Sequence, residues 1–277
     1  MYLRPTDLDA ALNALKGGRL AVLAGGTDFY PAQVGRPLPD DILDITALSA
    51  LRGVREEASG FRIGALTTWS ELLATPLPAW FNGLTLAARE VGGRQVQNAA
   101  TLAGNLCNAS PAADGVPALL ALDAAVELAA HDGVRRLPLA SFVTGSRRTA
   151  RRTEELVTAI VIPHWGERAR STFIKLGARR YLVISIVMVA GTLEADVSGA
   201  VSRAALAVGA CTEVAQRLPA LEAKLLGAPL DPALAGLVEA RHLATLRPIS
   251  DVRGSAEYRR DAALTLVRRA LRQLAHE

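Results

Sequence analysis

The 277-residue sequence predicts an α+β fold in two parts. Up to about residue 165, short apolar strands and short helices follow one another, separated by tight glycine-containing turns. Beyond that point three strand-like runs are followed only by helical segments, which is typical of a small α+β domain with a three-stranded antiparallel sheet and helices. Proline, glycine and charge concentrate between Pro163 and Arg170. We therefore predict three units, at 1–55, 56–167 and 168–277.

A strand and a glycine turn organise the first 30 residues. Thr6 is the expected cap of a short helix, and residues 20–24 form the apolar strand that follows it. The tetrapeptide Gly25-Gly26-Thr27-Asp28 comes directly after that strand. Two adjacent glycines allow positive φ and a close approach of the backbone to a ligand. The same tetrapeptide also suits an ordinary tight turn in which Thr27 or Asp28 caps the next segment.

The remaining elements are predicted from hydrophobic period and turn residues. Thr68 and Glu71 have the spacing of a capping box, which marks a helix start. The C-terminal helix places apolar residues on one face from about Ser255 onward. Other strands are expected at 41–45, 61–65, 125–129, 134–139, 155–162, 171–176, 182–194 and 204–210, and other helices at 84–91, 218–226 and 232–244.

The stretch from Asn98 to Asp123 is the most informative part of the chain. It reads as a polar loop from Thr101 to Ser110, followed by a short apolar helix that begins near Asp114. Bare backbone N–H groups and short polar side chains beside a helix start suit a bound dianion or a heteroaromatic edge. An ordinary strand-turn-helix connection with Asp114 as N-cap explains the same residues without a ligand.

Composition excludes several classes of protein. Half of the residues are hydrophobic and the mean hydropathy is +0.22, so a large core is expected. The longest apolar run, 182–193, is shorter than the roughly 18 residues of a membrane span, and the N-terminus has no signal pattern. A soluble, cytoplasmic protein is predicted. The net charge of +4 is spread thinly and aromatic residues make up 4%, which argues against nucleic-acid binding.

Clusters of charged or metal-ligating residues are few. Cys107 and Cys211 lie far apart and the four histidines are scattered, so no metal site is predicted. The densest basic cluster reads as a solvated loop in preference to a docking surface, and its members are Arg147, Arg148, Arg151 and Arg152.

Four motifs in chain order resemble one family. They are A-G-G-T-D at 24–28, N-A-A-T-L-A-G-N-L-C-N-A-S-P-A-A-D at 98–114, F-I-K at 173–175 with Arg179-Arg180, and D-V-R-G-S-A-E-Y-R-R at 251–260. Together they look like the FAD-binding (medium) subunit of molybdenum hydroxylases. That family includes the medium subunit of carbon monoxide dehydrogenase and the flavin subunit or domain of xanthine dehydrogenase. The resemblance covers almost the whole chain.

The resemblance implies a fold, a cofactor and partners. The fold is a two-part FAD-binding domain of the p-cresol methylhydroxylase type, followed by a small α+β domain. The cofactor is FAD, and no side chain of this chain acts as nucleophile, base or metal ligand. Hydroxylation takes place on a large molybdenum-cofactor subunit, and electrons pass through a small [2Fe–2S] subunit to this FAD and on to an external acceptor. The implied assembly is a heterotrimer, alone or dimerised.

The resemblance also implies roles for single residues. The first loop wraps the pyrophosphate, the second approaches the flavin and its phosphates, and Asp114 accepts from a ribityl or ribose hydroxyl. Lys175 lies near the N1/C2 edge of the flavin, where a cation favours the reduced form. Without the resemblance, Lys175 would be a solvated lysine at a strand edge. The implied cofactor-binding residues are Leu23, Ala24, Gly25, Gly26, Thr27, Asp28, Thr101, Ala103, Gly104, Asn105, Ser110, Asp114 and Lys175.

One departure concerns Ala103, which stands where the family has the first of two glycines. Its methyl group disfavours positive φ, so either a slightly shifted loop or a different mode of flavin binding is expected there, with FAD retained. Two alternatives belong to other classes. One is a self-contained flavin reductase similar to the enolpyruvyl-sugar reductase of cell-wall synthesis. The other is a scaffold subunit without flavin, in which Ala103 marks a decayed site.

Overall fold

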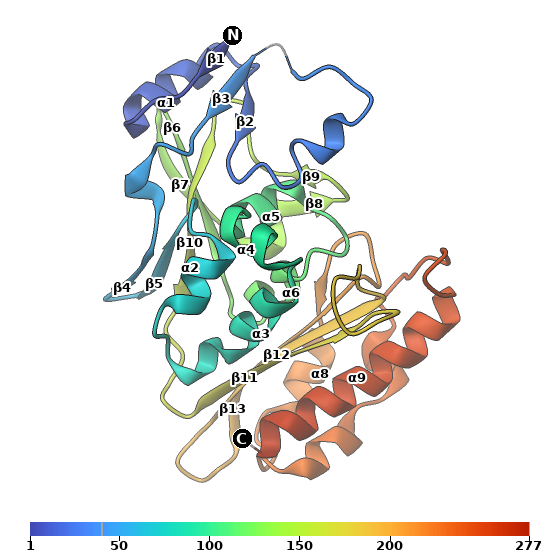
Figure 1. Ribbon diagram of the computed structural model, residues 1–277. Helices are drawn as coiled ribbons and strands as arrows, with labels where there is room; N and C mark the ends of the chain where they lie inside the picture. The colour runs from blue at the N-terminus through green and yellow to red at the C-terminus, as the bar shows by residue number, and fades with distance from the viewer. Residues whose placement is uncertain (40, 277) are drawn as a thin grey trace.

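The described residues form three larger sheets, which follow one another along the chain, and one two-stranded sheet. The computed structural model describes residues 1–39 and 41–276. In Figure 1 the sheets run from the blue end to the red end, and the two termini lie at opposite ends of the molecule. Short helices fill the space between the second sheet and the third. The predicted α+β fold in two parts is confirmed, whereas the division at residues 55 and 167 stays a prediction.

The first sheet is small and parallel, with strand order β1-β3-β2. Helix α1 (Leu8–Leu15) packs its buried face against this sheet. The cap of α1 is Asp7 rather than the predicted Thr6, because the Asp7 carboxylate accepts the Ala10 amide at 2.8 Å. The chain leaves β2 directly into the glycine turn. The strands are β1 (Tyr2–Leu3), β2 (Ala21–Leu23) and β3 (Ile42–Asp44).

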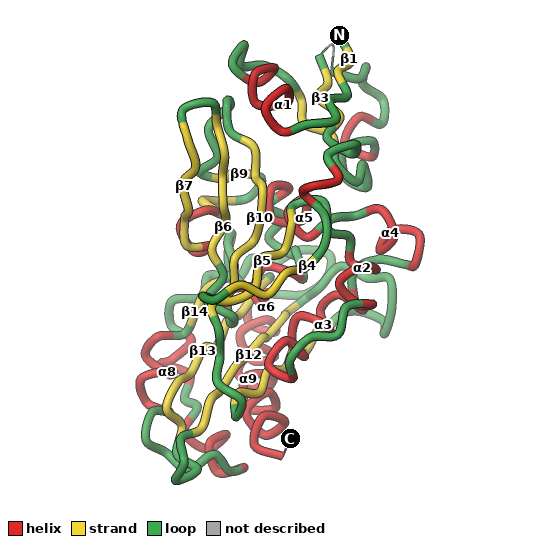
Figure 2. Tube along the Cα trace, turned by 90° about the vertical axis from the view of Figure 1, so that its left-hand side faces the viewer, coloured by secondary structure: helices red, strands yellow, loops and turns green. Residues whose placement is uncertain are grey.

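The second sheet is antiparallel, with order β4-β5-β10-β6-β7. Figure 2 shows it above the third sheet, with α3 and α6 beside both. Helix α7 (Leu139–Phe142) and a two-stranded hairpin, β8 (Val143–Gly145) with β9 (Arg148–Thr149), follow β7. The strands of the sheet are β4 (Val54–Glu57), β5 (Gly60–Gly64), β6 (Ala125–Ala130), β7 (Gly133–Pro138) and β10 (Leu156–Pro163).

Five helices lie between the sheets. The first of them starts with the predicted capping box, in which the Thr68 hydroxyl accepts the Glu71 amide and the Glu71 carboxylate accepts the Thr68 amide at 2.7 Å. Its neighbours bury a continuous apolar core with the second sheet. The helices are α2 (Trp69–Ala74), α3 (Asn82–Glu90), α4 (Arg94–Ala99), α5 (Leu102–Asn108) and α6 (Gly115–Leu120).

The third sheet has order β11-β12-β13-β14 and is buried on both faces. Along β12, Met188 and Ala190 pack with the core of the N-terminal part, while Val187 and Val189 pack under the C-terminal helices, as the two-residue period of a strand requires. In Figure 1 the sheet lies between the green helices and α8 and α9. The elements are β11 (Ala169–Leu176), β12 (Val187–Ala195), β13 (Val201–Gly209), β14 (Gln216–Arg217), α8 (Pro219–Leu225) and α9 (Ala256–His276).

The motif at residues 251–260, which runs into the start of α9, fixes the base of the β12–β13 hairpin. Arg259, 3% exposed, donates to the carbonyl of Ile186 at 2.6 Å, to that of Ala210 at 3.1 Å and to Asp251 at 2.7 Å. A buried guanidinium is stable only with such partners. The D-x-R-x-S-x-x-Y-R stretch is therefore a clamp on the start of β12 and the end of β13.

Several predicted elements differ from the structure. The third sheet has a fourth strand, β14, which is too short for a periodic signal. The strand predicted from residue 182 starts only at Val187, because residues 177–186 form a connection between β11 and β12 that is exposed at 178–182. The helix predicted at 232–244 is two 3₁₀ segments, Pro232–Leu237 and Ala240–Leu243. Among the described residues no helix combines the length and the apolarity needed to cross a bilayer.

Candidate functional site

A cavity of about 520 Å³ lies where the glycine turn meets the central helices. One side is the segment Ala24–Phe29, and the other is formed by α4, α5 and the residues around the β8–β9 hairpin. The structure thus brings together the first two motifs, which are more than 70 residues apart in the sequence. Of the predicted site residues, the cavity is lined by Ala24, Gly25, Gly26, Thr27, Asp28, Thr101, Ala103, Gly104 and Asn105.

The glycine turn presents unused backbone donors to this cavity. The amides of residues 25–28 donate no hydrogen bond to any other residue that the structure describes. Gly26 has a φ of +73°, which favours glycine. A Cβ on Gly25 would lie 2.0 Å from the carbonyl oxygen of Ala99, so the turn rests directly on the end of α4. Consecutive free amides in such a turn form an anion-binding concavity.

The opposite wall is a helix, which corrects the prediction of a loop from Thr101 to Ser110. The Thr101 hydroxyl caps α5 by accepting the Gly104 amide at 2.9 Å. Ala103 sits inside α5 and is not among the residues with positive φ. The expected conflict between its methyl group and a positive φ therefore does not arise. Polar composition concealed the helix, because its sequence L-A-G-N-L-C-N lacks strong helix formers apart from Leu and Ala.

Two residues that line the cavity each carry a buried polar atom with no partner among the described residues. These atoms are the acceptor Oδ1 of Asn105 and the donor Nε1 of Trp69. An unpaired buried polar atom costs about 1–3 kcal/mol, so such atoms commonly mark a missing partner. Gly115 lies against both side chains, since a Cβ there would approach each of them to 2.8 Å. The residues present, with the free amides, fit a polar, anionic ligand.

Asp114 and Lys175 form a buried ion pair beside the cavity rather than on its wall. Lys175 Nζ donates to Asp114 Oδ2 at 2.7 Å, and the Ser185 hydroxyl donates to Asp114 Oδ1 at 2.6 Å. The two charged side chains are only 7% and 8% exposed. Burial raises the pKa of Asp114, and the charge and hydrogen bonds of Lys175 and Ser185 oppose that rise. Lys175 is thus no solvated lysine, and Asp114 uses its carboxylate for this cluster instead of capping α6.

Two other predicted residues lie off the cavity wall. Leu23 is buried in the core at the end of β2, and the Ser110 hydroxyl accepts the Ala112 amide at 3.3 Å. Sequence reasoning missed residues that do line the cavity, among them Trp69, Thr149, Arg147, Arg151 and Cys107. Arginine clustering was visible in the sequence, but only the path of the β8–β9 hairpin decides which arginines face the cavity.

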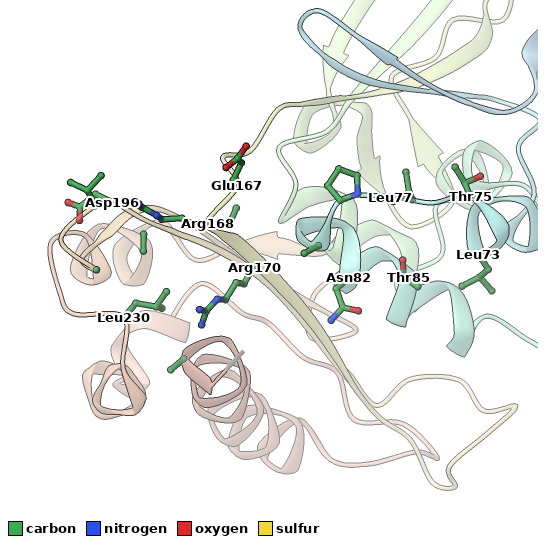
Figure 3. Close-up of a pocket in the computed structure, with 17 residues that line it drawn as sticks. Leu73, Thr75, Leu77, Asn82, Thr85, Glu167, Arg168, Arg170, Asp196 and Leu230 are labelled. Carbon is green, nitrogen blue, oxygen red and sulfur yellow. The ribbon is translucent and has the colours of Figure 1, made fainter.

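A second, larger groove of about 1070 Å³ lies elsewhere, between the start of α3 and the third sheet. Figure 3 shows Asn82 on one side of it, Arg168 and Asp196 on the other, and Arg170 between them. No predicted site residue lines this groove. Its charged residues are of both signs, so it does not select a ligand charge.

Comparison with known proteins decides the family. The profile described as "FAD binding domain in molybdopterin dehydrogenase" matches residues 1–165, and that of the "CO dehydrogenase flavoprotein C-terminal domain" matches residues 172–274. The chain belongs to the FAD-binding subunits of molybdopterin dehydrogenases. The resemblance inferred from the four motifs is thereby confirmed, and FAD is the cofactor of this family's N-terminal domain.

Individual relatives are similar in sequence or structure to this FAD-binding subunit over most of its length. The FAD-subunit of nicotinate dehydrogenase from Eubacterium barkeri is 32% identical, over 83% of this chain and 80% of the relative. The medium chain of glyceraldehyde dehydrogenase from Sulfolobus acidocaldarius is 31% identical, over 99% and 98%. A solved carbon monoxide dehydrogenase from Hydrogenophaga pseudoflava superposes with a TM-score of 0.88 at 28% identity, over 99% of this chain and 96% of that one. These relatives are subunits of dehydrogenases, so the chain is an oxidoreductase subunit.

Proposed function

We propose that this subunit holds FAD in the 520 Å³ cavity and passes electrons from a partner [2Fe–2S] subunit through the flavin to an external acceptor. A large molybdenum-cofactor subunit completes the proposed heterotrimer. The observation that carries the proposal is the row of free amides at residues 25–28, which faces α5 across the cavity. Unpaired N–H groups in a glycine turn are suited to a diphosphate, the anionic part of FAD.

The proposed roles follow from position. The backbone of 23–28 wraps the pyrophosphate, with Leu23 anchoring the turn in the core. Thr101, Ala103, Gly104 and Asn105 form the wall against the flavin and its phosphates, and Ser110 supports the segment after α5. The Asn105 Oδ1 acceptor, unpaired among the described residues, suits an N–H or O–H of the cofactor.

Lys175 and Asp114 lie behind the cavity wall and are proposed to act together on the flavin edge nearest to them. The Lys175 ammonium has three donors, of which one is used by Asp114 at 2.7 Å and one by the Glu90 carbonyl at 3.4 Å. A donor is left for an acceptor atom of the cofactor. A cation held in place by a buried carboxylate stabilises negative charge that develops beside it. FAD, when bound, supplies the one- and two-electron chemistry that joins cluster and acceptor.

The assembly is proposed from what the relatives are called. Medium chains and FAD-subunits are named parts of larger dehydrogenases. The solved carbon monoxide dehydrogenase is a molybdenum-cofactor enzyme, described in a form that lacks the Mo-pyranopterin moiety of that cofactor. The match of residues 172–274 to a flavoprotein C-terminal domain favours this arrangement over a self-contained flavin reductase. The paired glycines and free amides favour it over a scaffold without flavin. A cytoplasmic location remains a prediction.

The electron path is tested with the complex after its FAD has been removed. We expect the clusters of the intact complex, reduced with stoichiometric dithionite, to be reoxidised rapidly by NAD⁺, a quinone or oxygen. In the FAD-free complex the same step should be at least about ten-fold slower, and added FAD should restore it. Stopped-flow absorption of the clusters measures both rates. Equal rates with and without FAD would contradict the proposed path.

A further inference from the structure

The four arginines between residues 147 and 152 divide into two kinds. Arg148 pairs with Glu213 at 3.1 Å, and Arg152 pairs with Glu155 at 3.0 Å, and neither lines the cavity. Arg147 and Arg151 do line the cavity, and neither makes a salt bridge with any described carboxylate. Arg147 lies in the turn between β8 and β9 with a φ of +58°, whereas Arg148 begins β9. Arg151 and Arg152 lie in the segment after β9. The turns on either side of β9 thus point neighbouring side chains in different directions.

Each of the two cavity arginines donates side-chain hydrogen bonds to the described residues through its NH1 nitrogen alone. Arg147 NH1 donates to the side-chain oxygen of Asn108 and, at 3.4 Å, to the carbonyl of the same residue. Arg151 NH1 donates to the carbonyl of Glu155 at 2.7 Å and to that of Arg152 at 3.2 Å. The Nε and NH2 groups of both arginines donate to no other residue that the structure describes. Each guanidinium is thus held in place while part of its donor fork is unused.

The cavity has a net positive charge. Its charged lining residues are Arg147, Arg151 and Asp28, which gives two positive charges against one negative charge. Cys107 adds no charge, because burial raises the pKa of its thiol to about 11, although part of the residue remains exposed along the cavity. The positive charge of Arg151 opposes this rise. An anionic ligand is therefore favoured over a neutral one of the same shape.

We propose that Arg147 and Arg151 bind the diphosphate of FAD, together with the free amides of residues 25–28. The inference rests on the proposed function and extends it, since no motif identified these two residues. A guanidinium matches phosphate oxygens with two parallel N–H donors, and anchoring beforehand reduces the entropy lost on binding. The amides alone provide partial charges for a dianion, whereas the two arginines provide full ones. The cavity accordingly prefers FAD to riboflavin, which carries no phosphate.

The test compares Arg147→Gln and Arg151→Gln with Arg148→Gln, an exposed neighbour paired outside the cavity. The dissociation constant for FAD is measured on the full chain, freed of flavin, by quenching of tryptophan fluorescence at low and at high salt. Loss of a charge-assisted hydrogen bond predicts FAD binding about ten-fold weaker or more in each cavity variant, and less than about two-fold weaker in Arg148→Gln. The affinity of the variants should also depend less on salt than that of the wild type.

Arg151→Lys guards against a purely structural effect, since Arg151 also holds loop carbonyls. It should keep part of the FAD affinity and most of the salt dependence. If wild type binds FAD and both glutamine variants match Arg148→Gln, the role of the two arginines is wrong while the proposed function stands. If the folded wild type binds no FAD, both are wrong. Should Arg151→Gln not fold, Arg147→Gln and Arg151→Lys decide the question.

Discussion

Replacing Lys175 by methionine is expected to lower the free energy of unfolding by about 3–5 kcal/mol, because it leaves the Asp114 carboxylate buried without its counter-charge. Asp114 would keep only the Ser185 hydroxyl as a partner. The double variant Asp114→Asn/Lys175→Met removes the charge as well and should recover more than half of the loss. Lys224→Met, at an exposed position on α8, is the matched control and should change little. Urea unfolding of the full chain measures all four proteins.

The stability lost on replacing Lys175 by methionine should depend on pH. Burial raises the pKa of folded Asp114 above the unfolded value of about 3.9, so its contribution to stability is fully present below pH 3.9 and is lost as pH rises toward the folded pKa. Without Lys175 the folded pKa rises further and the loss extends to higher pH. The free energy of unfolding of Lys175→Met should therefore fall further below that of the wild type at pH 8 than at pH 5. A deficit that is constant or smaller at pH 8 would show that the pair does not carry the effect.

Gly25→Ala is expected to disrupt the cavity where the glycine turn contacts the end of α4. The new methyl group would lie 2.0 Å from the carbonyl oxygen of Ala99, so the turn and the end of α4 must separate. Overpacking of this kind costs about 1–3 kcal/mol of stability. Displacing the free amides should in addition weaken FAD binding by about ten-fold or more, since each hydrogen bond to a charged group contributes about 1.5–3 kcal/mol.

Gly236→Ala provides the control for this variant. Gly236 lies in the 3₁₀ segment Pro232–Leu237, and a Cβ there meets nothing within 4 Å. Its FAD affinity and its free energy of unfolding should be close to those of the wild type. Isothermal titration with FAD and urea unfolding separate the two effects. Unchanged FAD affinity in a folded Gly25→Ala would remove the turn from the binding site.

Local patterns predicted most of the secondary structure because they report local physics. The hairpin of β6 and β7, the capping box at Thr68 and the apolar stripe of α9 each follow from period or cap chemistry that acts within a few residues. Helix α5 was missed for the opposite reason. Its polar, glycine-containing sequence has weak helix propensity, and burial of Leu102 and Leu106 against the core determines its conformation.

In the candidate site, contacts between residues far apart in the sequence could not be predicted from local patterns. The glycine turn could be recognised from its own residues, but its contact with Ala99 depends on how β2 and α4 are packed. The partners of Asp114, which lie 61 and 71 residues away in the sequence, were likewise not predictable from spacing. Adjacent arginines look alike in a sequence. Arg147 lines the cavity, whereas Arg148 pairs with Glu213, and this difference depends on the path of the β8–β9 hairpin.

Whether this chain carries FAD can be read from the absorption spectrum of the purified full chain, with chromatographic identification of whatever heat releases. We expect flavin bands and about one FAD per chain, with riboflavin absent from the released material. A folded, colourless chain that also fails to take up added FAD would show that the cavity is not a flavin site.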